Sequence, residues 1–237
     1  MSNWQPLESN SELITNYMRD IGLDTTEFVF QDLLSYEEWA QEMIKKPVLG
    51  LLYIYEITAV QEKFRKEEEE ILAKENKPAP EGIFYMKQYA ENACGTIGCF
   101  HILGNLPAKY KSLVKADSLL AKFFEKVKGK TPSEAGNIFE GDDSLKEKHV
   151  EATNEGETNV NEHLDTCNHF IAFVEHDGFL YELDGRKNRP VPHGPTSPDT
   201  FLEDACKIVH TFIQREPENV NAGMIVLAAK PDEEEMN

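Results

Sequence analysis

Two runs of strand-forming residues flank the dipeptide Asp177-Gly178, and this arrangement constrains the fold more than any other stretch of the chain. The runs are His169 to Glu175 and Phe179 to Asp184. Asp-Gly is the strongest short-range signal for a two-residue hairpin turn. In such a hairpin His176 lies opposite Phe179, and the pairing continues outward from there. The register of this part of a β-sheet therefore follows from the sequence.

The register places His169 and Asp184 close together. Ile171 lies opposite Asp184, so His169 and Asp184 are diagonal neighbours with Cα atoms roughly 7–8 Å apart. At this separation an imidazole can meet a carboxylate. The other face of the hairpin is apolar and suits the core: Phe170, Ala172, Val174, Phe179, Tyr181 and Leu183. A turn of odd length would destroy both features, and we interpret His169 and Asp184 as a functional pair.

A cysteine with signs of reactivity lies between Gln88 and Gly98. Asn92 is a good helix N-cap, and an apolar run follows it. Cys94 is then in the first helical turn, where free N–H groups and the positive end of the dipole favour a thiolate. The amide of Gln88 is a neutral donor that can face charge developing beside the sulfur. A buried cysteine is often core filler, but the cap, the glycines and the amide favour a reactive thiol here.

The remaining elements follow from periodicity and breakers. Val48 to Tyr55 is almost wholly apolar and predicts a central strand covered on both faces. We also expect strands at 4–7, 28–30 and 224–229, and helices at 11–21, 33–44 (weak), 61–75, 113–127 and 201–215. Residues 190–195 are expected to form a rigid loop. Residues 151–165 are polar and acidic, and they predict a long mobile loop.

The chain is strongly acidic, with 24 Lys and Arg against 43 Asp and Glu and a net charge of −19. This charge argues against nucleic acid or an anionic membrane as partner and suits a basic partner. Plain solubility is an equally good reading of charge alone. Residues 1–230 are expected to form one domain, and 231–237 a short acidic tail.

The four cysteines, at positions 94, 99, 167 and 206, show no disulfide framework, which predicts a reducing compartment. The N-terminus does not resemble a signal peptide, and no apolar run approaches the ~20 residues of a membrane span. We expect a cytoplasmic protein, with the nucleus as a second location. Cys167 and His169 resemble half of a zinc site, but no second pair has ligand spacing. No metal or other cofactor is predicted.

A cysteine at a helix N-terminus, a strand histidine and a carboxylate are the components of a cysteine-protease site. The thiolate attacks a carbonyl, the imidazole accepts and returns a proton, and the carboxylate orients the imidazole. Gln88 and the Cys94 N–H would form the oxyanion hole, in which one donor contributes about 3–4 kcal/mol of transition-state stabilisation. Cys99, His101 and Cys206 are interpreted as core residues.

These motifs resemble those of the ubiquitin carboxyl-terminal hydrolase family. The matching segments are Gln88, Asn92-Ala93-Cys94-Gly95-Thr96-Ile97-Gly98, His169-Phe170-Ile171 and Tyr181-Glu182-Leu183-Asp184-Gly185-Arg186. The similarity extends from Pro6 to the strand at Ala228-Ala229 and is closest to isozyme three among the short members. It implies a papain-like α/β fold with a central antiparallel sheet flanked by helices and a knotted backbone.

The resemblance also implies a function. It predicts a thiol hydrolase that releases small adducts or peptides from the C-terminal glycine of ubiquitin, acting as a monomer. Cys94 would be the nucleophile, His169 the base, Asp184 the orienting residue and Gln88 the oxyanion donor. Residues 151–164 take the place of the family's active-site crossover loop, and Glu8, Glu12 and Asp32 stand where acidic residues meet the basic tail of ubiquitin. A ubiquitin-binding module with little activity and a papain-like acyltransferase remain as alternatives.

Overall fold

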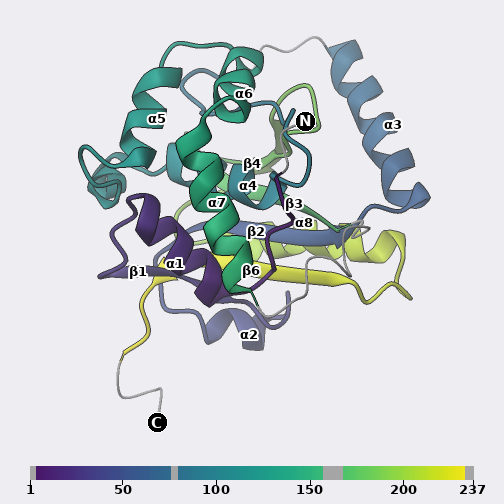
Figure 1. Ribbon diagram of the computed structural model, residues 1–237. Helices are drawn as coiled ribbons and strands as arrows, with labels where there is room; N and C mark the ends of the chain where they lie inside the picture. Colours follow the sequence, from purple (N-terminus) through teal and green to yellow (C-terminus); the bar gives the residue numbers. More distant parts are fainter. Residues whose placement is uncertain (1–3, 76–79, 157–167, 233–237) are drawn as a thin grey trace.

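A six-stranded antiparallel sheet forms the centre of the computed structural model, which describes residues 4–75, 80–156 and 168–232. Its strand order is β1-β6-β2-β3-β4-β5 (Figure 1). The strands are β1 (Phe28–Asp32), β2 (Val48–Glu56), β3 (Asn168–His176), β4 (Phe179–Leu183), β5 (Val191–Pro195) and β6 (Ala222–Ala229). β2 lies between β6 and β3 and is buried along almost its whole length. The prediction of a central strand at 48–55 is thus confirmed.

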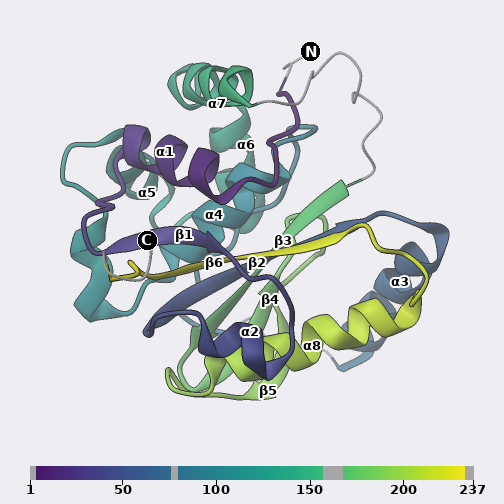
Figure 2. The same ribbon diagram turned by 90° about the horizontal axis from the view of Figure 1, so that it is seen from below.

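Helices cover both faces of the sheet. They are α1 (Ser11–Ile21), α2 (Glu38–Glu42), α3 (Ala59–Glu75), α4 (Cys94–Gly104), α5 (Leu119–Val127), α6 (Pro132–Glu140), α7 (Asp143–Glu155) and α8 (Phe201–Arg215), with a 3₁₀ helix η1 (Ala108–Leu113). One face carries α1 and α4 to α7, and the other carries α2 and α8 (Figure 2). α3 packs against α8 through buried Gln61, whose Nε2 donates to the carbonyl of Phe212 at 3.2 Å.

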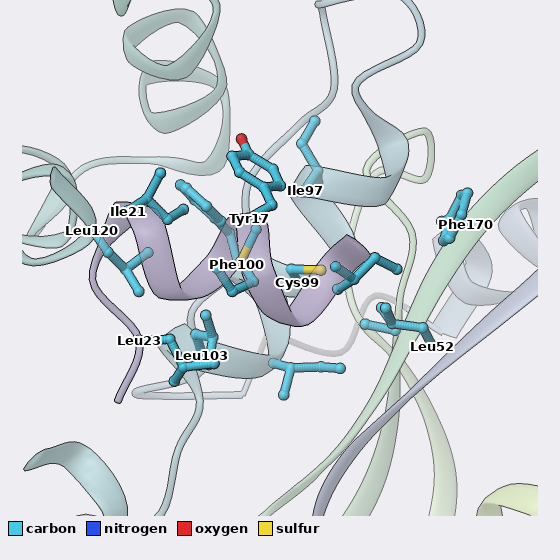
Figure 3. Close-up of a cluster of buried hydrophobic side chains, with 14 of the residues drawn as sticks. Tyr17, Ile21, Leu23, Leu52, Ile97, Cys99, Phe100, Leu103, Leu120 and Phe170 are labelled. Carbon is cyan, nitrogen blue, oxygen red and sulfur yellow. The ribbon is translucent and has the colours of Figure 1, made fainter. Parts of the chain in front are cut away.

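Helix α4 is the centre of the larger core. Every residue from Cys94 to Leu103 is buried, as expected for a helix that is apolar on all sides. Figure 3 shows Phe100 and Leu103 of this helix among Tyr17 and Ile21 of α1 and Leu120 of α5. A Cβ at Gly98 would lie 2.9 Å from Leu52 of β2, so the glycine permits close packing of α4 on the sheet.

The predicted hairpin is confirmed with its register. Ala172 pairs with Leu183 and His176 with Phe179. Asp177 and Gly178 have φ angles of 49° and 80°, the two positive values that a type I′ turn requires. We expected only one face of the hairpin to be buried. Ile171 and Phe173 of its other face are also buried, against α8. Phe179 is 46% exposed because it lies beside the turn.

Helices α1 and α8 and strands β1 and β6 match their predictions closely. Asn10 caps α1 by accepting from the N–H of Leu13 at 3.0 Å, and Gly22 ends the helix with a φ of 126°. The predicted helix at 61–75 begins slightly earlier, at Ala59.

Several local predictions are wrong. Residues 4–7 form no strand; Trp4 and Leu7 are instead buried in the core beside α4. Only Glu38–Glu42 of the range 33–44 is helical. The helix expected at 113–127 begins at Leu119, because Asp117 has a φ of 61° and Ser118 caps the helix.

Two predicted loops contain regular structure. Residues 191–195 form edge strand β5, since Val191 pairs with Glu182 of β4. The expected loop at 151–165 begins later, because α7 continues through Glu155 after the N-cap Asp142. Residues 157–167, which include most of the expected crossover loop and Cys167, lie outside the described residues, as do 233–237 of the acidic tail.

Candidate active site

Cys94 is the first residue of α4, as predicted, but the cap differs from the expectation. The N-cap position is Ala93, which makes no side-chain cap bond. Asn92 has a φ of 62°, a left-handed conformation that asparagine tolerates, and its Nδ2 donates to the carbonyl of Trp4 at 3.3 Å. Asn92 therefore connects the N-terminal segment to the turn that precedes α4.

The sulfur of Cys94 lies in a buried, donor-rich environment. The side chain of His169 and the backbone N–H groups of Gly95 and Phe170 all stabilise its charged form. Burial opposes ionisation, but the His169 hydrogen bond and charge, together with the two N–H groups, lower the pKa of Cys94 below that of an ordinary thiol. The site therefore favours a thiolate.

His169 joins Cys94 to Asp184. Its Nε2 lies 2.7 Å from Oδ1 of Asp184, so the predicted diagonal pair is present. Both residues are almost completely buried, and Tyr55 of β2 packs edge-on against the imidazole at 5.9 Å. Burial disfavours the imidazolium, but the Asp184 carboxylate and the Cys94 sulfur outweigh it and raise the pKa of His169 to about 9.

Asp184 is ionised in this arrangement. Burial raises its pKa, but the charge and hydrogen bond of His169 dominate and hold the pKa of Asp184 well below its usual range. The lowered pKa of Cys94 and the raised pKa of His169 thus favour a thiolate and an imidazolium beside the Asp184 carboxylate. This arrangement supplies a nucleophile together with an adjacent proton donor, as covalent acyl transfer requires.

Gln88 lies against the turn that carries Asp184. Its N–H donates to the carbonyl of Gly185 at 2.9 Å, and a Cβ at Gly185 would lie 2.9 Å from the Cβ of Gln88. Only glycine permits this approach. The side-chain Nε2 donates to the carbonyl of Ala90 at 3.3 Å, and the buried Oε1 accepts no hydrogen bond from the described residues.

Further residues that sequence reasoning missed hold this turn. The N–H of Arg186 donates to Oδ1 of Asp184 at 2.9 Å, and the hydroxyl of Tyr85 donates to the Asp184 carbonyl at 2.8 Å. The N–H of Lys187 donates to the same carbonyl at 2.9 Å. No sequence signal pointed to Tyr85 or Lys187.

The three acidic residues expected to bind substrate lie near the start of α1. Glu12 is in the first turn of α1, and the Ser11 hydroxyl donates to Asp32 of β1 at 2.7 Å, which brings Asp32 to the same place. Glu8 precedes the helix and lies next to Gly156, just after α7. Glu12 and Asp32 are exposed, and Glu8 is half-buried.

The core assignments of the other residues are confirmed where they are described. Cys99 and Cys206 are buried, and His101 is bonded to the backbone of Met86, with its pKa lowered by burial to about 4. Among residues 4–75, 80–156 and 168–232, no group of His, Cys, Asp and Glu could hold a metal ion. No helix in these ranges has the length and apolar character needed to cross a membrane.

Comparison with known proteins gives a consistent result. Residues 4–214 match the model of the family described as "Ubiquitin carboxyl-terminal hydrolase, family 1". A ubiquitin carboxyl-terminal hydrolase of Drosophila melanogaster is 36% identical over 229 residues, covering 97% of this chain and 99% of the relative. Human isozyme L1 is 33% identical over 224 residues, covering 94% of this chain and 97% of the relative.

The fold is also known from solved structures. The catalytic domain of Trichinella spiralis UCH37, solved with ubiquitin vinyl methyl ester bound, superposes with a TM-score of 0.74 at 17% identity. The match covers 96% of each chain. The α/β architecture expected from the sequence, with an antiparallel sheet between helices, is therefore confirmed.

Proposed function

Because the chain belongs to ubiquitin carboxyl-terminal hydrolase family 1, we propose that Cys94, His169 and Asp184 are its catalytic triad and that its substrates are ubiquitin C-terminal adducts. The family establishes the reaction class, thiol-dependent ubiquitinyl hydrolysis. The observation that carries the residue assignment is the position of His169, which interacts with the Cys94 sulfur and lies 2.7 Å from the carboxylate of Asp184 through its Nε2.

In the proposed reaction, the Cys94 thiolate attacks the carbonyl carbon of the terminal glycine. Negative charge develops on the carbonyl oxygen, and the N–H of Cys94 and the amide of Gln88 donate to it. One N–H of the Gln88 amide is donated to the carbonyl of Ala90, and the second N–H is the donor for this step. His169 gives its proton to the leaving amine or alkoxide, and a thioester joins Cys94 to ubiquitin.

Water completes the cycle. Now neutral, His169 takes a proton from a water molecule, which attacks the thioester carbonyl and releases ubiquitin as a carboxylic acid that loses its own proton to solvent. The Cys94 thiolate and the His169 imidazolium are restored. Asp184 stays ionised throughout and keeps the imidazole oriented, because its carboxylate is bonded to Nε2.

The finer assignments form part of the same proposal. Matches along nearly the full length of short relatives support a single domain over residues 1–230 and kinship with the short members. The similarity to isozyme three within that group rests on the sequence motifs alone. Glu8, Glu12 and Asp32 would contact the basic tail of ubiquitin. Small adducts and short peptides would be the preferred leaving groups, and the protein would be a cytoplasmic monomer. The unbridged Cys94, Cys99 and Cys206 are compatible with a reducing compartment.

A single-turnover assay tests the function. Ubiquitin carrying a fluorogenic amide at its C-terminus is mixed with excess enzyme, with and without an added amine. We expect free ubiquitin in both cases, and no product with Cys94→Ala. Product formation by Cys94→Ala would remove the assigned nucleophile. Amine adducts would indicate the acyltransferase, and binding without turnover by the native chain would indicate the binding module.

A further inference from the structure

The turn that follows Asp184 is held by a segment far away in sequence. The hydroxyl of Tyr85 donates to the Asp184 carbonyl at 2.8 Å, and Nζ of Lys87 donates to the carbonyl of Lys187 at 2.6 Å. The N–H of Gln88 donates to Gly185 at 2.9 Å. The segment from Tyr85 to Gln88 therefore fixes the backbone of this turn from one side.

Helix α3 holds the same turn through its acidic face. Oε1 of Glu62 pairs with the Arg186 guanidinium at 2.7 Å, and Glu69 accepts from the N–H of Asn188 at 3.1 Å. Glu68 pairs with Nζ of Lys187. Three consecutive residues of the turn are thus each bonded to a carboxylate of one helix.

Lys187 is the buried member of this group. Its side chain is 4% exposed, and its ammonium lies between Glu68 of α3 and the fully buried Glu182 of β4. Glu182 also accepts from Nε2 of His193 of β5 at 2.9 Å. Buried ions cost so much desolvation free energy that an apolar cluster of similar volume is often equally stable, although such ions can fix one conformation. The placement of Lys187 therefore suggests a role in orientation.

The ammonium of Lys187 also acts electrostatically on Asp184. Burial raises the pKa of Asp184, and the charges of His169 and, to a smaller extent, Lys187 lower it. The charged and titratable groups around Lys187 are Glu182 of β4, Glu68 of α3, His193 of β5 and Asp184 itself. Lys187 thus joins α3 and β4 to the turn that carries the orienting carboxylate.

We propose that Lys187 is a positioning residue for the reaction: its ammonium, held between Glu182 and Glu68, fixes the turn after Asp184 and thereby the orientation of His169. This inference rests on the proposed function, because it gives Asp184 and His169 their catalytic roles. Lys187 acts through Asp184 and does not touch substrate. A displacement of only about 1 Å in a catalytic group can lower turnover by ~10²-fold.

The test compares Lys187→Met with Lys187→Arg. Both kcat and KM are measured with the fluorogenic ubiquitin amide, and the pH profile of Cys94 alkylation is measured with iodoacetamide and mass spectrometry. We expect Lys187→Met to lower kcat by roughly 10-fold to 100-fold with little change in KM. In this variant, alkylation of Cys94 should require a higher pH, closer to that needed for an ordinary thiol, because His169 stabilises the thiolate less. Lys187→Arg keeps the charge and should restore much of both properties.

Two further variants separate positioning from stability. Lys187→Met leaves Glu182 buried opposite His193 alone and can destabilise the fold, so the double variant Lys187→Met with Glu182→Met removes both charges. We expect this variant to fold with a near-native Tm while kcat stays low. The control is Lys63→Met on α3, where the side chain is 73% exposed, and it should leave kcat and the profile unchanged.

Three results would overturn the inference. The first is a native kcat and a native pH profile of alkylation in Lys187→Met. The second is native turnover in the double variant. The third is a kcat loss in Lys63→Met as large as that in Lys187→Met. The proposed function fails separately, if the native chain does not hydrolyse the ubiquitin amide. In that case the alkylation profile still decides whether Lys187 orients the pair of Cys94 and His169.

Discussion

The two ring nitrogens of His169 have different partners, and these partners determine which nitrogen keeps its proton and which one exchanges it. Nε2 is bonded to Asp184 at 2.7 Å, so Nδ1 is the nitrogen that serves Cys94. Because the carboxylate only accepts, it keeps a proton on Nε2. Proton exchange with the sulfur or the leaving group is then confined to Nδ1. The carboxylate thus sets the tautomer as well as the charge of the proposed base.

Replacing Asp184 with Asn tests this assignment of the two ring nitrogens. The amide can donate to Nε2 and hold the wrong tautomer, which lowers turnover by ~10⁴-fold in a serine protease. We expect a smaller loss here, roughly 10²-fold to 10³-fold, because a thiolate is intrinsically more nucleophilic. Fluorogenic ubiquitin amide gives kcat, and circular dichroism checks the fold. Unchanged turnover in a folded variant would mean that another group orients His169.

The raised pKa of His169 predicts the pH dependence of the reaction. In the proposed mechanism, turnover needs the Cys94 thiolate and the His169 imidazolium together. The thiolate forms at a lower pH than in an ordinary thiol, because the pKa of Cys94 is lowered. The imidazolium is lost as the pH rises through about 9, the raised pKa of His169. We expect a plateau through neutral pH and a fall near pH 9 in kcat/KM. A fall that begins near pH 6.5, the ordinary pKa of histidine, would contradict the raised value.

The same shifts affect stability with opposite signs. His169 has a higher pKa in the folded than in the unfolded protein, so its contribution is fully present below about pH 6.5 and is lost as the pH rises through about 9. Asp184 has a lower pKa in the folded protein. Its contribution is present above about pH 4 and is lost as the pH falls through its depressed folded value.

At the residue scale the sequence predicted that the three groups of the proposed triad lie together, but not what surrounds them. Cys94, His169 and Asp184 were found from a helix start and a hairpin register, both of which are local. Asn92 was assigned as a cap because asparagine favours that position, but it adopts the left-handed conformation and bonds Trp4. Lys187 could not be predicted, because its burial depends on α3, β4 and β5 meeting at one point.

At the scale of elements, α6 supports the segment that carries Gln88. The N–H of Lys87 donates to the carbonyl of Pro132 at 2.9 Å. A Cβ at Gly136 of α6 would lie 2.2 Å from the carbonyl oxygen of Lys87, which is backbone and cannot move aside. The helix and the segment are in contact at this glycine. The proposed oxyanion donor therefore depends on a helix that does not itself reach the active site.

Gly136→Ala should therefore displace the segment before Gln88. We expect a lower Tm and a lower kcat, because overpacking forces backbone shifts that typically cost ~1–3 kcal/mol. The matched control is Gly141→Ala at the end of the same helix, where φ is −87° and a Cβ would lie at an ordinary 3.5 Å from Asn137. Native Tm and kcat in Gly136→Ala would show that α6 and the Gln88 segment can separate without consequence.

Elements with strong local signals were predicted well, and those defined by tertiary contacts were not. The Asp-Gly turn and the cap of α1 are local, and both are confirmed. β5 was missed because Pro192, Gly194 and Pro195 read as a loop, yet Val191 pairs with β4 at the sheet edge, where proline is tolerated. α7 was missed because its polar outer face resembles a loop, while Leu145, His149 and Ala152 are buried.

At the scale of the whole molecule, the net charge of −19 acts on any basic partner. Such a charge raises association rates through long-range attraction, which salt screens beyond about 8 Å at physiological ionic strength. The charge alone does not locate a binding site. Glu12 and Asp32, however, are exposed at one place, because Ser11 bonds Asp32 at the start of α1.

Reversing these two acids should separate a binding role from general solubility. In a Cys94→Ala background, Glu12→Lys with Asp32→Lys should slow ubiquitin association and flatten its salt dependence, with the largest effect at low salt. The control changes Asp199 and Glu218 to Lys. These residues are exposed and lie at the two ends of α8, on the opposite face of the sheet. Both variants change the net charge by the same amount. If the acidic surface acts only through net charge, association should slow equally in the two variants. Stopped-flow association at low and high salt measures the difference. A native association rate that does not change with salt would mean that the acidic surface serves solubility alone.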